Sequence, residues 1–328
     1  MKSLICNKKF LLILIPLSFL LGSCNQSKSE NVDESKIKYF TYYDEPISNG
    51  IANNFVFLNS EGNVIKTEIL EMGRKKDIFY SELNSENKKF YMLGNGGLFE
   101  IDLIDYTAKM LSEDNINQVT FYGEKIFYYQ NKGFKDDHYS AGICEISSGC
   151  TYLDYLVSDL YFSDNALFVA ARWKDDYKLF QFTSNGIEES DLAFNVFSIH
   201  KINGVLYGHV GHAFLQLSNQ KVLPFVDEQL EPLTLDVELF MDSKGNAYLL
   251  DSIQNILYSA IFNENYIVCS EHLYLEQEYT VYPSLVDDTI TLVGEDSLIY
   301  TLNLVTKEIN EEGTSFDLKR FYHTILLK

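Results

Sequence analysis

From Ile37 onward, the chain alternates short apolar runs with turn residues, a pattern typical of β-hairpins. No segment of twelve or more residues carries a convincing 3.6-residue period with capping residues, so alternating strands and helices in a parallel α/β sheet are disfavoured. Asn-Gly or Gly-Asn dipeptides mark turns that begin at Gly62, Gly94, Asn185, Asn203 and Gly245. The sequence therefore predicts an all-β domain.

One four-residue phrase recurs along this domain, and its spacing predicts the architecture. The phrase is an apolar residue, an aromatic or apolar residue, a mostly polar residue and an apolar residue, followed soon by a turn. Its copies are 55–58, 98–101, 143–146, 179–182, 214–217, 257–260 and 299–302. Successive copies lie about 41 residues apart on average. A period near 40 with several strands per unit is what a β-propeller blade requires, because a twisted four-stranded sheet buries both faces only against neighbouring sheets.

We expect each copy to be the third strand of a blade, paired with an apolar second strand. Seven copies favour seven blades, and the weak copy at 55–58 leaves six blades as an alternative. The predicted second strands include 125–129, 166–170, 204–207 and 289–293. Too few residues precede the first copy to form the earlier strands of a complete blade. The C-terminal run 316–327 has β character. The C-terminal run is therefore expected to complete the first blade and close the ring.

The segment 241–251 resembles a turn of the NHL and related bacterial propellers. In those proteins an Asp-x-x-Gly-Asn turn precedes an apolar strand that ends in Asp. The matching residues here are Asp242, Gly245, Asn246 and Asp251. Such a hairpin needs positive φ at Gly or Asn and a carboxylate that accepts hydrogen bonds from turn amides. The resemblance covers about 15 residues, and it implies the propeller fold without implying a ligand.

The first 24 residues have the shape of a bacterial lipoprotein signal. Lysines at 2, 8 and 9 precede an apolar run over 10–21, which is too short to span a bilayer because spanning takes about 20 apolar residues. The run ends in Leu21-Gly22-Ser23-Cys24, which resembles the lipobox of bacterial lipoproteins. The resemblance implies cleavage before Cys24, a diacylglycerol on its sulfur, and acylation of the new N-terminus by a fatty acid such as palmitate.

These features predict the domain organisation and the location. Residues 1–23 are the expected signal peptide, residues 24–36 the lipidated cysteine with a flexible polar tether, and residues 37–328 the propeller domain. The expected location is the extracytoplasmic side of the bacterial cell envelope, with the lipid in the membrane. Asn25 favours the outer membrane in a Gram-negative cell, and the cell membrane is expected otherwise.

The charge of the chain excludes one class of partner. The full chain has 26 basic and 47 acidic residues, a net charge of −21. Removal of residues 1–23 takes away three lysines and leaves 23 basic and 47 acidic residues, a net charge of −24. Such a surface repels phosphate backbones and anionic headgroups, so we expect no nucleic-acid partner.

Cys144 and Cys150 flank a five-residue segment with the character of a tight hairpin connection. In an oxidising envelope this pair is a candidate disulfide, worth about 2 kcal/mol through loop closure. Two reduced thiols, one of them packed in the core, are the alternative. In the disulfide case Cys269 is left over and is expected to be unpaired and buried.

Candidate metal ligands and catalytic acids are few. His209 and His212 form the one close histidine pair, with His200 upstream. Residues three apart on a strand point to opposite faces, so these histidines are weak metal candidates, and we expect no cofactor. Aspartate pairs at 136–137, 175–176 and 287–288 each lie beside an expected turn, where solvated carboxylates are the default.

Three functions remain open from the sequence, and the weakest is a periplasmic redox or metal protein that uses His200, His209 and His212. We favour a non-enzymatic binding or scaffold module that engages an envelope protein or a glycan, because no catalytic motif is present. The alternative is a glycan hydrolase or lyase whose carboxylates converge, beside aromatic side chains, in the central funnel of the propeller. Aromatic residues near loop ends are candidate ligand contacts: Tyr42, Tyr43, Trp173 and Tyr282.

Overall fold

The structure, a computed structural model, describes residues 33–48, 50–72, 78–94, 97–135, 138–251, 253–282, 284, 286–294, 298–311 and 323–327. Glu34–Lys328 form one compact unit. The described residues contain β-strands and one short 3-10 helix, η2 (Glu34–Lys36), and no α-helix among them is available to cross a membrane. The all-β prediction is confirmed. The expected signal peptide and Cys24 lie outside the described residues.

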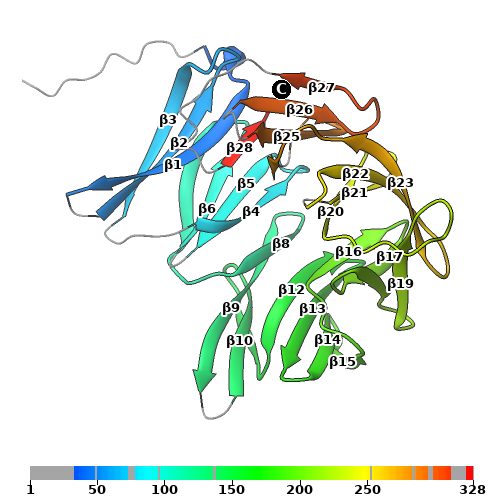
Figure 1. The fold of residues 1–328 in the computed structure, drawn as a ribbon. Coiled ribbons are helices and arrows are strands. Elements are labelled where there is room, and N and C mark those ends of the chain that lie inside the picture. The colour runs from blue at the N-terminus through cyan, green and yellow to red at the C-terminus, as the bar shows by residue number, and fades with distance from the viewer. Residues whose placement is uncertain are drawn as a thin grey trace, which may run out of the picture. The chain divides into compact units, whose positions relative to one another are not determined.

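The strands follow one another in four-stranded antiparallel sheets (Figure 1). Sheet 1 has the order β28-β1-β2-β3, with β1 (Tyr39–Ile47), β2 (Gly50–Leu58), β3 (Val64–Met72) and β28 (His323–Leu326). Sheet 2 contains β4 (Ile78–Asn84), β5 (Lys89–Gly94), β6 (Gly97–Asp102) and β7 (Thr107–Ser112). Sheet 3 contains β8 (Gln118–Tyr122), β9 (Lys125–Lys135), β10 (His138–Glu145) and β11 (Gly149–Leu153). Sheet 4 contains β12 (Leu156–Ser163), β13 (Ala166–Trp173), β14 (Asp176–Thr183) and β15 (Gly186–Leu192).

Three more sheets complete the described strands. Sheet 5 contains β16 (Ser198–Ile202), β17 (Val205–His209), β18 (Ala213–Gln216) and β19 (Lys221–Val226). Sheet 6 contains β20 (Val237–Met241), β21 (Ala247–Asp251), β22 (Ile256–Phe262) and β23 (Ile267–Tyr274). Sheet 7 contains β24 (Tyr279–Tyr282), β25 (Thr289–Gly294), β26 (Ile299–Asn303) and β27 (Ile309–Glu311). A short parallel pairing of β19 with β23 joins sheets 5 and 6 at their fourth strands.

Every copy of the recurring phrase lies in the third strand of its sheet, as the sequence predicted. In chain order these strands are β2, β6, β10, β14, β18, β22 and β26. The copy at 55–58, which the sequence treated as weak, is an ordinary third strand, because β28 takes the first position of sheet 1 and pairs with β1. The predicted second strands fall in β9, β13, β17 and β25.

The core consists of hydrophobic clusters, each made by residues of two consecutive sheets. Between sheets 1 and 2, for example, Phe40 packs against Phe57 and Phe90, with ring centroids 5.4 and 5.5 Å apart. A further cluster joins sheet 7 to sheet 1 through Ile299, Tyr39 and Leu326. The high aromatic content of the chain therefore fills the space between sheets, because broad rings pack well against twisted sheet faces.

The turn that resembles NHL propellers has the expected chemistry. Asp242 accepts hydrogen bonds through Oδ1 from the backbone N–H groups of Lys244 (2.9 Å) and Asn246 (2.8 Å). Gly245 has a φ of +83°, which a residue without Cβ adopts freely. The carboxylate therefore satisfies turn amides that would otherwise face solvent.

The compact unit includes the last residues of the segment that the sequence predicts to be a tether. Glu34–Lys36, assigned above to the tether, form η2. The backbone N–H of Ile37 donates to the carbonyl of Glu34, and Lys66 on β3 lies 3.5 Å from the Glu34 carboxylate. The side chain of Ile37, directly after η2, is buried in the core cluster between sheets 1 and 2.

Candidate functional site

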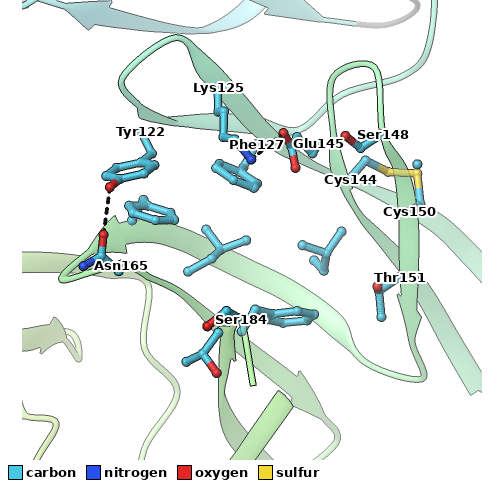
Figure 2. Close-up of a pocket in the computed structure, with 16 residues that line it drawn as sticks. Tyr122, Lys125, Phe127, Cys144, Glu145, Ser148, Cys150, Thr151, Asn165 and Ser184 are labelled. Atoms are coloured by element: carbon cyan, nitrogen blue, oxygen red, sulfur yellow. Dashed lines mark hydrogen bonds and ion pairs between the residues drawn. A yellow bond between two sulfur atoms is a disulfide. The ribbon is translucent and has the colours of Figure 1, made fainter. Parts of the chain in front are cut away.

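A groove of about 780 Å³ lies between sheet 3 and sheet 4, and we call it the aromatic groove (Figure 2). Sheet 3 contributes the β8–β9 turn, parts of β9 and β10, and the β10–β11 hairpin. Sheet 4 contributes the β12–β13 turn and the neighbouring ends of β12, β13 and β14. Its volume lies within the range of small-molecule sites, about 300–1,000 Å³.

Strand register explains why aromatic and small side chains face this groove from both sheets. Residues directly opposite each other on paired strands point to the same face of a sheet. On sheet 4, Phe162 of β12 pairs with Leu167 of β13, which pairs with Phe182 of β14. On sheet 3, Phe127 of β9 pairs with Glu145 of β10. One row of each sheet therefore faces the other sheet.

Three aromatic rings gather where β8, β9 and β12 meet. Phe162 stacks on Tyr122, with centroids 4.4 Å apart and an interplanar angle of 24°. It also stacks on Phe127, at 5.4 Å and 14°. Phe127, Phe162 and Phe182 are half-buried, and Tyr122 is 48% exposed. Part of the aromatic surface is therefore open to the groove.

The groove stays open because the residues farther along it are small. Sheet 3 presents Ser148, Gly149 and Thr151 there, and sheet 4 presents Thr183 and Ser184. A Cβ placed on Gly149 would meet no atom within 4 Å. Neighbouring propeller blades need bulky side chains to fill the space between them, so small residues here leave a hollow.

Two pairs of polar side chains at the groove interact with each other, and the charged pair carries no net charge. The Tyr122 hydroxyl donates to Asn165 Oδ1 at 2.8 Å, across the gap between the two sheets (Figure 2). Lys125 Nζ lies 3.0 Å from Glu145 Oε1, so the two charges offset each other. Of the sixteen described residues that line the groove, Glu145 is the one carboxylate and Lys125 the one cation.

A disulfide joins Cys144 and Cys150, which occupy paired positions on β10 and β11. Cys144 is buried against Tyr91 and Leu98 of sheet 2. Both cysteines also border the aromatic groove, so the bond ties together two strands at its wall. Cys269 is a buried free thiol among the described residues, and burial raises its pKa to about 12.

A second cavity, about 400 Å³, is lined by the first strands of sheets 2 to 5, and we call it the first-strand cavity. Glu82 of β4, Asp159 of β12 and His200 of β16 border it, together with Tyr129 and Tyr161. These carboxyl groups come from strands far apart in the sequence, and the sequence analysis did not single them out.

Asp159 connects three sheets within this cavity. Its carboxylate accepts hydrogen bonds from the Gln118 side chain of β8 and from the Ile199 backbone N–H of β16, the latter at 2.5 Å. It is 4% exposed, and burial raises its pKa to about 7, with a further upward contribution from the charge of Glu82. The hydrogen bonds act in the opposite direction, since they stabilise the ionised form.

The structure gives the three candidate histidines different surroundings. His200 Nε2 lies 2.8 Å from Ser198 Oγ, and burial lowers the pKa of this imidazole to about 4. His212 Nδ1 lies 2.9 Å from the Leu235 carbonyl, and the buried His209 Nε2 has no hydrogen-bond partner. Among the described residues no three His, Cys, Asp or Glu side chains are grouped to hold a metal ion. His209 ends β17 and His212 follows in the turn.

A third cavity of about 720 Å³ lies among the first strands of sheets 2, 6 and 7 and their turns. It is acidic, because Glu82, Glu238, Asp242, Asp287 and Asp288 all border it. Burial raises the pKa of Glu238, with Asp236 adding to the shift. No Lys or Arg is among the described residues that line it, in contrast to the aromatic groove.

The aromatic candidates from the sequence lie in several environments. Tyr42 is buried in the core and donates to Asn53 Oδ1 at 2.8 Å, so its ring is not open to a ligand. Tyr282 borders the acidic cavity, and Trp173 packs edge-to-face on Tyr139 at 5.5 Å. The rings that do line a groove (Tyr122, Phe127, Phe162 and Phe182) were missed. The alternation of these aromatic residues along the strands was visible in the sequence. Whether the gap between two sheets stays open, however, depends on the side chains of both sheets.

The comparisons with known proteins concern the fold. No protein-family model matches the chain, and no curated protein matches it. The structure is similar to apo AztD from Citrobacter koseri, with a TM-score of 0.54 at 10% identity over 88% of this chain and 97% of that one. It is also similar to the Cps50 (Swd1) β-propeller domain of Myceliophteria thermophila, with a TM-score of 0.50 at 8% identity over 72% and 88%. At these identities the likeness shows the fold alone, which is a β-propeller.

Proposed function

We propose that this protein is a lipid-anchored, non-enzymatic binding module of the bacterial cell envelope, and that it holds its ligand in the aromatic groove. The observation that supports the proposal is a cavity of ligand size whose half-buried rings are open to it. Glycoside hydrolysis uses two carboxyl groups, whereas the groove has Glu145, already paired with Lys125. The groove is therefore better suited to binding than to hydrolysis.

We propose further that the seven sheets are the blades of one closed ring, with β28 as the innermost strand of the first blade. The contacts of Leu326 support closure. It pairs with Tyr39 in sheet 1, and its backbone N–H donates to Thr291 Oγ1 in sheet 7 at 3.2 Å. Ile299 of sheet 7 packs in the same cluster as Tyr39 and Leu326. In such a ring the first-strand cavity and the acidic cavity face the centre.

The anchor is proposed at Cys24, and it is tested on the full chain. In a bacterial host with lipoprotein processing, we expect the protein to incorporate labelled palmitate and to fractionate with membranes. The Cys24→Ser variant should incorporate no label and should remain unprocessed or leave the membrane fraction. Equal labelling of the two proteins would refute the anchor.

Binding by the groove is tested with the full-length protein in detergent, immobilised and exposed to separate protein and glycan fractions of bacterial envelopes. We expect the wild type to retain material from one fraction. Thr151→Trp adds bulk to the groove from an exposed position, so it should abolish retention without removing a core contact. Tyr274→Ala, which removes a 66% exposed ring from β23 in sheet 6, is the matched control and should bind as wild type does. Retention that Thr151→Trp leaves intact would refute the groove as the site.

The first-strand cavity supports a second candidate, a glycan hydrolase. Its specific support is Asp159, whose pKa of about 7 suits a general acid, in a cavity that Glu82 also borders. An enzyme of this kind should release reducing ends from a glycan, and Glu82→Gln should abolish the release. Binding without any release, on glycans that the protein retains, would refute this candidate.

A further inference from the structure

We infer that the aromatic groove recognises a neutral oligosaccharide built of pyranose rings. The inference rests on the proposed function of the groove as the ligand site, and it adds the chemical class of the ligand. It is carried by a combination of features: aromatic ring surface open to the groove, a rim of neutral hydrogen-bonding groups, and an internally neutralised pair of charges.

The open ring surface favours a ligand with apolar faces. A pyranose ring presents C–H groups on its broad faces, and the partial positive charge of those hydrogens is attracted to the negative face of an aromatic ring. Phe127 and Phe162 are nearly parallel, at 14°, and Phe182 lies on the same row of sheet 4 as Phe162, two strands away. A series of rings along one groove matches a chain of sugar units better than it matches a single compact ligand.

The rim of the groove favours a ligand with hydroxyl groups at its edges. Thr151 and Ser184 place hydroxyl groups at the groove, whereas the Thr183 hydroxyl bonds within its own turn, to the Gly186 carbonyl and the Asn185 N–H. Asn165 Oδ1 accepts a hydrogen bond from the Tyr122 hydroxyl, and this bond orients the Asn165 side chain. The N–H₂ group of the same amide is then left as a donor. Hydroxyls and amides both donate and accept, which suits the mixed donor and acceptor edge of a sugar.

The balance of charge favours a neutral ligand. Lys125 and Glu145 lie 3.0 Å apart, so an anionic ligand would have to compete with Glu145 for the one cation of the groove. The chain as a whole carries a net charge of −21, which further disfavours polyanions. A cationic ligand would be drawn instead to the acidic cavity, whose described lining holds no Lys or Arg. A neutral sugar chain does not compete for Lys125, is not repelled by the net charge and is not drawn to the acidic cavity.

The test uses the full-length protein and four neutral oligosaccharides, cellohexaose, maltohexaose, xylohexaose and mannohexaose, with hexagalacturonate as the charged comparison. Binding is measured by isothermal titration calorimetry. We expect at least one neutral hexasaccharide to bind and to bind at least tenfold more tightly than hexagalacturonate. Tyr122→Ala and Thr151→Trp should each weaken that binding at least tenfold, and Tyr274→Ala should leave it unchanged. A urea midpoint equal to that of the wild type establishes that each variant is folded.

The outcomes separate this inference from the proposed function. Absence of binding by all four neutral sugars, or tighter binding of hexagalacturonate, would overturn the inference. Envelope material that is retained through the groove gives an independent check. Loss of retention after periodate treatment of this material supports a sugar ligand. Loss of retention after protease treatment alone indicates a protein ligand, which overturns the inference but leaves the binding function intact. Failure to retain any envelope fraction would overturn the proposed function itself.

Discussion

At the scale of single residues, Asp159 connects three consecutive sheets. It lies on β12, and its carboxylate accepts from Gln118 on β8 and from Ile199 on β16. One buried side chain thus holds the first strands of three consecutive sheets. Removal of a hydrogen-bonded carboxyl group from such a position leaves buried donors without partners, which costs about 1–3 kcal/mol for each group.

The raised pKa of Asp159 predicts how stability depends on pH. Its carboxyl titrates near 7 in the folded protein and near 3.8 ordinarily, so between these values the folded form keeps a proton that the unfolded chain releases. The free energy of unfolding therefore falls as the pH rises through this window, by up to about 4 kcal/mol. Asp159→Asn does not titrate, so we expect it to be less stable than the wild type at pH 4.5 and the difference to shrink by pH 7.5.

Urea unfolding at several pH values between 4.5 and 7.5 measures this difference. His200 has the opposite dependence, because a lowered pKa near 4 adds stability as the pH rises, but wild type and variant share that contribution. Glu228→Gln alters an exposed carboxylate and is the control for the loss of a carboxyl group from the protein. A difference between Asp159→Asn and wild type that stays constant or widens would contradict the assignment.

Gly208 lies on a strand where the neighbouring side chains leave no room for a Cβ atom. A Cβ at this position would lie 2.7 and 2.8 Å from the two Cγ atoms of Val196 and 3.2 Å from Leu217 Cδ2. Val196 is buried and both of its methyl groups are involved, so a rotation of its side chain gives little relief. We expect Gly208→Ala to lower the free energy of unfolding by about 1–3 kcal/mol.

A double-variant cycle, measured by urea unfolding, identifies the cause. Val196→Ala removes the methyl groups that the new Cβ would meet. The pair Gly208→Ala and Val196→Ala should therefore cost less than the sum of the two single changes. Strictly additive costs would show that the contact with Val196 is not the reason for glycine here.

At the scale of elements, the β10–β11 hairpin links the core to the aromatic groove. Its disulfide closes a loop of sequence separation 6, and the hairpin carries Glu145 and Thr151 to the groove wall. A loop this short gives modest stabilisation, about 2 kcal/mol, through the entropy of the unfolded chain. Replacement of both cysteines should therefore lower stability without unfolding the protein.

The change to test is the double variant Cys144→Ala and Cys150→Ala, compared with the wild type by urea unfolding with and without dithiothreitol. We expect the reductant to destabilise the wild type by about 2 kcal/mol and to leave the double variant unaffected. Cys269 is a free thiol in both proteins, so it does not contribute to the difference. A wild type that is indifferent to the reductant would contradict a stabilising disulfide.

The sequence predicted the elements better than it predicted the site, and the reason is physical. A third strand is recognisable because its apolar phrase and the following turn are local, as in 179–182 before the Asn185-Gly186 turn. The groove depends instead on two strands 35 residues apart, which bring Phe162 onto Phe127, and on small residues such as Thr151 opposite them. The same applies to Asp159, whose partners lie 41 and 40 residues away.

At the scale of the whole molecule, the decisive feature is where the C-terminal strand pairs. β28 lies beside β1 at the edge of sheet 1, and the backbone N–H of Leu327 donates to the Lys38 carbonyl at 2.9 Å. Leu326 also belongs to the cluster that includes Ile299 of sheet 7. In a propeller, a blade assembled from both ends of the chain prevents the first and last blades from separating.

Deletion of residues 323–328 tests ring closure, because the deletion removes the buried Leu326 and Leu327 together with the pairing to β1. Each buried leucine is worth about 2–5 kcal/mol, so we expect a lower urea midpoint. In a closed ring, amide hydrogen exchange should accelerate in both sheet 1 and sheet 7, since each loses a neighbour, while sheet 4 changes least. The variant Leu326→Ala with Leu327→Ala keeps the backbone pairing and should show a smaller effect. Acceleration confined to sheet 1 would mean that sheet 7 does not depend on the C-terminal strand, and the closed ring would then be wrong.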